Sequence, residues 1–406
     1  SKKNALKEIS LEEFKNPPRE YRGMPFWSWN CKLEMEELER QIEELKEMGF
    51  GGFFMHVRTG MDTPYLSDEY MEMVRGCVEK AKAEGMRACL YDEDRWSSGA
   101  AGGLVTKEKK YRQKYLLFTP WAYGEKGGVE TPGGFLSQPL RNGKGRLLAR
   151  YTVMLDEEGY LGKYRILAEG EEGGENTWYA YLETAGANPW YNGQAYSDTL
   201  NKEAVERFLQ VTHEKYKEWV GSDFGEAIPM VFTDEPQFAR KHTLDLAEGK
   251  KDVTLPWTDD CEEGYLHKYG ESLLEALPEL FWELPEGKIS RARYRYHDYI
   301  AERFATAFAG TYGQWCERNG LMLTGHLMEE PALESQCAAV GETMRSYGSF
   351  SLPGIDMLRR DLEYTTAKQA QSMARQHGKK GISSELYGVT GWDTDFRDYK
   401  FHGDWQ

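Results

Sequence analysis

The sequence lacks the features of a disulfide-stabilised or membrane-spanning protein. Its six cysteines show no C-x-x-C spacing, and Cys77, Cys89 and Cys316 fall within apolar helix or strand patterns. This arrangement favours free, buried thiols in a reducing compartment over a disulfide framework. There is no run of about 18 apolar residues and no charged-then-apolar leader. We therefore expect a cytoplasmic protein that has no membrane partner.

Clusters of lysine and arginine are also missing, and acidic residues dominate. The formal net charge of the 406 residues is −16, whereas binding to nucleic acid depends on clustered positive charge. The sequence contains no Gly-x-Ser-x-Gly elbow and no Walker motif, and no Gly-x-Gly-x-x-Gly follows the first predicted strand. These absences argue against a nucleic-acid partner, a serine-elbow hydrolase and a nucleotide-binding enzyme.

What the sequence does contain is one alternation of helix and strand, repeated along the chain. Met35, Leu38, Ile42 and Leu45 recur at helical spacing, Gly49 ends that helix, and a short apolar strand follows. The strands predicted in this way span residues 24–30, 51–58, 86–93, 228–235, 321–327, 354–358 and 381–386. Such alternation predicts a parallel sheet with right-handed crossovers. We predict an α/β fold, a (β/α)8 TIM-like barrel that is incomplete at strand 8.

Two stretches interrupt the alternation and predict insertions. Residues 113–190 lose the helical period and show strand-forming runs between glycine-rich turns, which predicts an inserted antiparallel β subdomain after strand 3. Residues 237–288 are polar and mostly helical in pattern, as expected of an element at the rim. The barrel is therefore divided between residues 1–112, with strands 1–3, and residues 191–406, with strands 4–7.

Polar side chains end the predicted strands, whereas glycine and apolar residues begin them. These strand-end residues are Asn30, His56, Arg58, Asp92, Glu93, Asp234, Glu235, His326, Glu329, Glu330, Asp356 and Glu385. In a barrel of parallel strands all of these ends meet at one mouth, where active sites lie. The asymmetry predicts an active site at this mouth.

The mouth is rich in carboxylates, which suits the hydrolysis of glycosides. One carboxylic acid protonates the leaving oxygen, and a second activates water or attacks the anomeric carbon. Glu235 follows an apolar strand directly before Pro236, and Glu385 follows two small serines, so both are candidate catalytic groups with Glu329 or Glu330. Ion pairing with a neighbouring Arg or Lys is the structural alternative.

Other residues near the strand ends are candidates for binding a substrate. They are Trp29, Asn30, His56, Arg58, Asp92, Glu93, Asp234, His326, Tyr387 and Trp392. Aromatic rings can stack on sugar faces, although packing at the rim explains each tryptophan as well. The small-residue loop over residues 97–103 could bring backbone N–H groups to a ligand.

These motifs resemble the glycoside hydrolase family 106 α-L-rhamnosidases and their relatives. The resemblance is carried by Pro25-Phe26-Trp27-Ser28-Trp29-Asn30, Gly52-Phe53-Phe54-Met55-His56-Val57-Arg58, Tyr65-Leu66-Ser67, Tyr91-Asp92-Glu93 and Ser98-Gly99-Ala100-Ala101-Gly102-Gly103, with weaker matches at Thr233-Asp234-Glu235, Gly325-His326 and Glu385. It implies a (β/α)8 catalytic domain, inverting hydrolysis of terminal α-L-rhamnosides and a bound calcium ion. By position it implies Glu235 as the acid and Glu330, Glu329 or Glu385 as the base. Members of that family are usually much longer, with β-sandwich domains around the barrel.

Several alternatives remain open at the level of the sequence. They are another exo-glycosidase of β-galactosidase type, a non-catalytic carbohydrate-binding protein, and a metal-dependent hydrolase or isomerase using the same histidines and carboxylates. The expected partner is an oligosaccharide or glycoside. The sequence requires no cofactor and assigns no metal ligand, so calcium is expected from the resemblance alone. It does not predict an oligomeric state.

Overall fold

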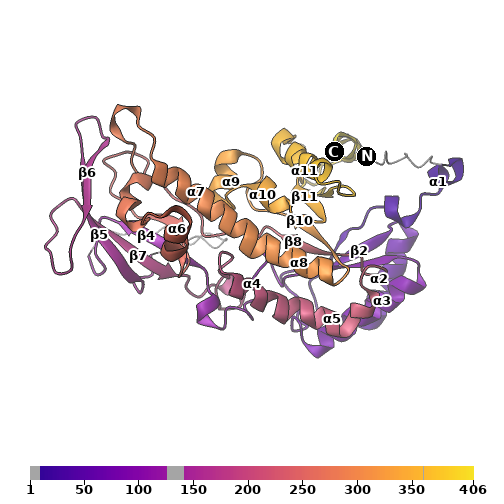
Figure 1. Cartoon of the computed structure of the whole chain (residues 1–406). Coiled ribbons are helices and arrows are strands. Elements are labelled where there is room, and N and C mark those ends of the chain that lie inside the picture. The colour runs from indigo at the N-terminus through magenta and orange to yellow at the C-terminus, as the bar shows by residue number, and fades with distance from the viewer. Residues whose placement is uncertain (1–9, 126–140, 360) are drawn as a thin grey trace.

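The computed structural model describes residues 10–125, 141–359 and 361–406, and two sheets organise it (Figure 1). The larger sheet has seven strands in the order β1-β2-β3-β8-β10-β11-β12, and every neighbouring pair is parallel. Its strands are β1 (Phe26–Trp29), β2 (Gly52–Val57), β3 (Arg87–Tyr91), β8 (Met230–Asp234), β10 (Met322–His326), β11 (Leu352–Asp356) and β12 (Ser383–Glu385). The seven strands predicted from the sequence are thereby confirmed.

The parallel sheet is curled into a half-barrel, so the expectation of a (β/α)8 barrel is met only in part. In the part of the chain that the structure describes, no further strand pairs with the outer edge of β1 or of β12. β12 is followed by helix α12 (Phe396–Trp405). The observed fold is therefore a mixed α/β fold whose parallel sheet is open on one side.

The two faces of the half-barrel bury different sets of side chains because successive residues of a strand point in opposite directions. Phe54 and Phe232 belong to a small aromatic cluster on the concave face. Phe53 and Val231, one residue earlier in each strand, belong to the main core against the helices. Both faces are apolar, as expected of buried parallel strands.

Helices cover the convex face of the sheet. They are α2 (Met35–Glu47), α3 (Asp68–Ala83), α4 (Lys202–Phe208), α5 (Glu214–Val220), α7 (Arg291–Phe304), α8 (Thr311–Arg318) and α11 (Tyr364–Gln376). The Ser67 hydroxyl accepts a hydrogen bond from the Tyr70 N–H at 3.1 Å, so α3 begins at the cap predicted from the sequence. α4 and α5 are joined by a π-helical turn over Leu209–His213, and α7 and α8 by one over Ala305–Gly310. α4 contacts α8, and the two continuous helices run side by side (Figure 1).

The second sheet is antiparallel and lies at the opposite end of the molecule from α2 and α3 (Figure 1). It has the strand order β6-β5-β7-β4-β9, with β4 (Lys114–Thr119), β5 (Arg146–Leu155), β6 (Leu161–Ile166), β7 (Thr177–Thr184) and β9 (Val253–Pro256). Residues 126–140 of the predicted β subdomain lie outside the described residues. β9 belongs to the second predicted insertion and pairs with β4, so the two insertions form one sheet.

The remaining helices are short. They are α1 (Leu11–Lys15), α6 (Cys261–Tyr269), α9 (Leu333–Ala339) and α10 (Thr343–Tyr347). No helix in the described ranges combines the length and the apolar character that crossing a membrane requires.

Candidate active site

Six side chains from neighbouring parallel strands meet at the carboxyl end of the concave face. They are His56 on β2, Tyr91 on β3, Asp234 on β8, His326 on β10, Asp356 on β11 and Glu385 on β12. His326 is in register with Asp234, and Asp356 is in register with Glu385. The strand ends therefore bring together groups that are far apart in the sequence, with His56 and Glu385 separated by 329 positions.

His326 lies at the centre of this cluster. Its Nε2 atom is 3.2 Å from an Asp234 carboxylate oxygen, 3.6 Å from Asp356 and 3.7 Å from Glu385. The imidazole is almost completely buried. A buried imidazole between three carboxyl groups is suited to carrying the positive charge that balances them.

The protonation of this pair follows from its neighbours. Burial alone would lower the pKa of His326, but contact with Asp234 and the charge of Asp356 outweigh burial and raise it well above its usual range. Burial opposes ionisation of Asp234, yet contacts with His326 and Tyr91 bring its pKa below the usual range. The Tyr91 hydroxyl donates to Asp234 at 2.6 Å. The pair is therefore an imidazolium and a carboxylate.

Glu235 opens from the same strand end into a cavity of about 310 Å³, lined also by Glu330 and Asp356. Its backbone has a φ of 47°, and its N–H donates to the carbonyl oxygen of His326 at 3.1 Å. Left-handed backbone is uncommon in non-glycine residues and is concentrated at functional sites. Burial raises the pKa of Glu235 well above its usual range, and the Asp234 charge raises it further. The surroundings of Glu235 therefore favour the protonated form, which a general acid requires.

Glu385 is another partly accessible carboxyl group of the cluster. Burial raises its pKa to about 8, the negative charge of Asp234 acts in the same direction, and the charges of His326 and Arg58 oppose both. One carboxylate oxygen from each of Asp234 and Glu385 and a ring nitrogen of His326 could meet at a metal ion, and so could one ligand atom from each of Glu235, His326 and Asp356. The cluster thus brings the candidate acid and a second carboxyl group around one imidazole.

The structure corrects the expectation that Glu329 or Glu330 is a free catalytic group. Glu330 is buried and accepts hydrogen bonds from the Tyr347 hydroxyl at 2.6 Å and from the Asp356 N–H at 2.9 Å. Glu329 forms an ion pair with Arg240. Both oxygens of Glu330 therefore accept hydrogen bonds. Glu329 forms the ion pair with a basic residue that the sequence analysis gave as the structural alternative.

Asp92 and Glu93 do not face the cluster, which corrects their assignment to substrate binding. The alternation of β3 points Tyr91 inward, so Asp92 points toward the helices, where it accepts hydrogen bonds from Ser98 and from the Tyr312 hydroxyl, the latter at 2.9 Å. Glu93 is fully buried. Its two oxygens accept bonds from the backbone N–H groups of five residues, namely Asp94, Gly99, Ala100, Ala101 and Gly102. The loop predicted to offer its N–H groups to a ligand therefore offers them to Glu93.

The proposed aromatic contacts also need correction. Trp29 is 2% exposed and packs edge-on against Trp27 and Tyr70 on the helix side, so it cannot stack on a sugar in this structure. Trp392 is fully exposed, and Tyr387 packs against Tyr399 and His402. The structure does not place either ring in the histidine and carboxylate cluster.

His56 and Arg58 lie beside the cluster. His56 stacks on Phe26 and meets Tyr91 edge-on, and burial lowers its pKa to about 4, so it is neutral. Both of its ring nitrogens are buried without a hydrogen-bond partner among the described side chains and backbone. Buried polar atoms normally have partners, and a ligand hydroxyl would supply one. Arg58 and Asn30 are exposed at the ends of their strands.

The substrate-binding candidates omitted two residues that belong to the cluster, Tyr91 and Asp356. Tyr91 could have been found from its position in the strand. It lies two residues after Cys89 and so points to the same face of the sheet, where the side chains of this strand are apolar or aromatic. Asp356 ends a five-residue strand, and its importance depends on the register with Glu385, which the sequence does not encode locally. Tyr347, which holds Glu330, comes from α10, and no motif marks it.

Comparison with known proteins adds a fold likeness. Neither a protein family profile nor a curated sequence matches the chain. A solved rhamnosidase from Novosphingobium sp. PP1Y superposes with a TM-score of 0.64 at 14% identity, over 97% of this chain and 55% of that one. The catalytic domain of a β-amylase from Paenibacillus polymyxa gives 0.40 at 10% identity, over 90% and 86%, and a chitobiase from Flavobacterium johnsoniae gives 0.37 at 11%, over 90% and 38%.

The rhamnosidase likeness concerns the fold. The chain spans about half the length of that protein, and family 106 membership is not shown by any of these matches. The shared feature is the arrangement of the helices and sheets, into which this chain places its histidine and carboxylate cluster.

Proposed function

We propose that the protein is a glycoside hydrolase that removes a terminal sugar by carboxylic acid–base catalysis, with α-L-rhamnosides as its substrates. The observation that carries the proposal is the convergence of Glu235, Asp234, His326 and Glu385 at the carboxyl edge of the half-barrel. The fold likeness to a rhamnosidase supports the choice of sugar. An exo-glycosidase of another specificity would use the same groups.

In this proposal Glu235 donates a proton to the leaving glycosidic oxygen. Glu385, once ionised, removes a proton from a water molecule that attacks the anomeric carbon, and the configuration inverts. Asp234 and the His326 imidazolium keep the electrostatic balance of the site, because their opposite charges lie 3.2 Å apart. In the same proposal His56 and Arg58 orient sugar hydroxyls, a role that is supported by the lack of a protein partner for the His56 nitrogens in the described ranges.

A panel of nitrophenyl glycosides tests the proposal. We expect release of nitrophenol from the α-L-rhamnoside, and NMR of the first product should show inverted anomeric configuration. If only a β-galactoside is cleaved, the proposed glycosidase activity stands and the proposed α-L-rhamnoside substrate is wrong. If none of the glycosides is cleaved, with or without added calcium, the glycosidase proposal fails.

The pH dependence of kcat/KM should report the two carboxyl groups. The proposed base acts only when ionised, so activity should fall as the pH drops below the pKa of Glu385, about 8. The proposed acid acts only when protonated, so activity should also fall once the pH exceeds the raised pKa of Glu235. The Arg58 charge lowers the pKa of Glu385, so Arg58→Met should move the acidic limb to higher pH. An unchanged limb in this variant would contradict the role of Glu385.

Calcium remains a prediction from the family resemblance, and the residues present are compatible with it. Calcium prefers oxygen ligands, which Asp234 and Asp356 could supply, and one oxygen of Asp356 is buried without a hydrogen-bond partner in the described structure. When bound, the ion would neutralise these carboxylates and hold sugar hydroxyls. At a hundredfold excess over its Kd, calcium should stabilise the fold by about 2.7 kcal/mol, measured as a rise in Tm that Asp356→Asn reduces. No change of Tm in wild type would remove calcium from the proposal.

A metal-dependent hydrolase or isomerase is the second candidate function. It is favoured by the two trios of potential ligands that share His326, because imidazole with carboxylates suits transition metals better than calcium. The test is a chelator. Loss of activity that only a transition metal restores would favour this candidate, and full activity in the chelator would exclude it.

A further inference from the structure

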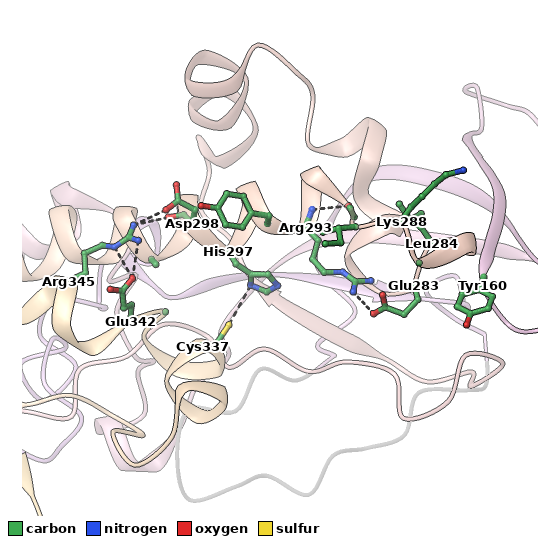
Figure 2. A pocket seen from close by; sticks show the side chains of 16 residues that line it. Tyr160, Glu283, Leu284, Lys288, Arg293, His297, Asp298, Cys337, Glu342 and Arg345 are labelled. Atoms are coloured by element: carbon green, nitrogen blue, oxygen red, sulfur yellow. Dashed lines mark hydrogen bonds and ion pairs between the residues drawn. The ribbon is translucent and has the colours of Figure 1, made fainter. Parts of the chain in front are cut away.

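A second cavity, of about 830 Å³, is lined by residues of α7, of α9 and of the segment that follows α9. Figure 2 shows its lining, in which His297 and Asp298 of α7 face Cys337 of α9, Glu342 and Arg345. The far wall comes from the insertions, with Tyr160 and Glu283. Sites for small molecules commonly have volumes of about 300–1,000 Å³. The cavity is therefore large enough to admit one.

A lysine, a histidine and a cysteine meet at the wall of this cavity. Lys241 Nζ lies 2.8 Å from His297 Nδ1 and 3.6 Å from Cys337 Sγ. Sγ lies 3.7 Å from the same histidine nitrogen, the contact drawn in Figure 2. Cys337 is half-buried and lines the cavity, whereas Lys241 is 9% exposed and lies behind it.

Lys241 has no carboxylate partner within the described residues. The two arginines of the cavity are paired with acids, Arg293 with Glu283 and Arg345 with Asp298. Lys241 instead contacts the rings of Phe238 and Tyr296, at 5.3 and 5.7 Å from their centres. A buried ammonium group requires a partner. The group within its reach that can carry a negative charge is the thiol of Cys337.

The hydrogen-bonding roles within the trio are fixed by chemistry. An ammonium group only donates, so Nδ1 of His297 accepts from Lys241 and its ring proton is on Nε2. Burial and the Lys241 charge lower the pKa of His297 to about 3, which keeps the ring neutral. Nδ1 therefore cannot donate to Sγ. Lys241 is the donor that can stabilise a Cys337 thiolate.

We propose that Cys337 is a nucleophilic thiol that forms mixed disulfides with low-molecular-weight disulfides entering this cavity. The thiolate attacks one sulfur of RS–SR, a bond forms between Cys337 Sγ and that sulfur, and the original S–S bond breaks. The released RS⁻ takes its proton from solvent, so no separate oxidant is needed. An adjacent cation and access to solvent are the conditions that make a cysteine reactive.

The other cysteines provide internal comparisons. Cys77, Cys89, Cys261 and Cys316 are completely buried, and burial raises their pKa values. Cys31 is exposed, and its Sγ contacts a backbone carbonyl oxygen at 3.3 Å, which does not stabilise a thiolate. Cys337 is the cysteine that combines access with a neighbouring cation. It should react fastest.

The position of Cys337 links this thiol to the candidate active site, a consequence that rests on the proposed function. The Gln336 side chain donates to the carbonyl oxygen of Glu330 at 2.7 Å. The N–H groups of Phe238 and Lys241 donate to Ala339 and Ala338, both at 2.9 Å. α9 therefore joins the segments that follow both Glu235 and Glu330. A group attached to Cys337 would displace this junction and lower glycosidase activity.

The experiment is thiolation by glutathione disulfide and by an aromatic disulfide, followed by mass mapping. At pH 7 we expect one fast modification per chain, located on Cys337, with a rate about tenfold above that of Cys31. Lys241→Met should slow it about tenfold, and Lys241→Arg should retain most of the rate. Lys288→Met, which removes a cation of the same cavity that does not contact the thiol, should leave it unchanged.

Two results would overturn the proposal. One is that Cys337 of the wild-type protein stays unmodified while Cys31 reacts. This result does not depend on the folding of any variant. The other is an equal rate in folded Lys241→Met and wild type. If Cys337 is thiolated but glycoside cleavage is absent from the start, the proposed function fails and the reactive thiol stands.

Discussion

Glu235→Gln should lower kcat for an aryl α-L-rhamnoside by about 10³-fold, within the range of about 10²–10⁴ that general acid catalysis contributes. The amide keeps the size of the side chain but has no acidic proton for the leaving oxygen. Because burial raises the pKa of this carboxyl group and so favours its neutral form, the substitution changes little charge in the cluster. The fold should therefore be retained, which circular dichroism and thermal unfolding can check.

The leaving group distinguishes an acid from a residue that only shapes the cavity. A substrate with a good leaving group, such as a dinitrophenolate, needs little protonation, so the variant should lose much less activity on it. Glu329→Gln is the matched control, because Glu329 lines the same cavity but is paired with Arg240, and it should keep most of the activity. A Glu235→Gln enzyme with equal losses on good and poor leaving groups would remove Glu235 from the role of acid.

The half-barrel could be predicted from the sequence because each strand carries its own signal. Apolar runs ending at Glu235, His326 and Glu385 are local, and parallel strands deliver their ends to one edge whatever the pairing order. The antiparallel sheet was predicted less completely. Its β9 strand pairs with β4 across more than a hundred residues, and no local pattern encodes a contact of that length.

The site was predicted less well than the fold. Successive residues of a strand point to opposite faces of the sheet, so an error of one position assigns a side chain to the wrong face. Tyr91 points to the cluster and Asp92 to the helices, so choosing the acidic neighbour put two structural carboxylates into the site. Trp29 was misplaced for the same reason, since it shares the parity of Trp27 in the core. Glu235 escapes this rule because its left-handed backbone turns it after the strand has ended. The packing on the two sides of the sheet decides which residues of a strand point to the cluster. The sequence does not reveal this choice when both faces of the strand are apolar.

The network that supports the cluster also explains why carboxylates that are not catalytic are placed so near it. Ser98 donates to Asp92 and accepts from the N–H of Asp234 at 2.8 Å. The loop that carries Ser98 is held by Glu93, and Gly99, with a φ of 136°, lets the backbone curl around that carboxylate. The position of Asp234 therefore depends on Glu93 through the loop.

Glu93→Gln should lower the free energy of unfolding by about 3 kcal/mol, because hydrogen bonds to a charged group contribute about 1.5–3 kcal/mol each. All partners of the Glu93 oxygens are N–H donors. An amide would place its own NH₂ against two or three of them, leaving donors facing donors in a buried loop. Urea unfolding at pH 7 measures the change. Glu47→Gln, at an exposed position at the end of α2, is the control and should stay within about 0.5 kcal/mol of wild type.

The stability of Glu93→Gln also tests whether Glu93 is ionised in the folded protein. Burial raises the pKa of this carboxyl group, whereas the hydrogen bonds from the backbone N–H groups lower it. A protonated carboxyl group would need an acceptor for its O–H, and the five N–H groups provide none, so the arrangement favours the ionised form. If Glu93 were neutral in the folded protein, replacement by the neutral amide would change stability little. A loss near 3 kcal/mol therefore supports an ionised Glu93, and a change within about 0.5 kcal/mol would contradict it.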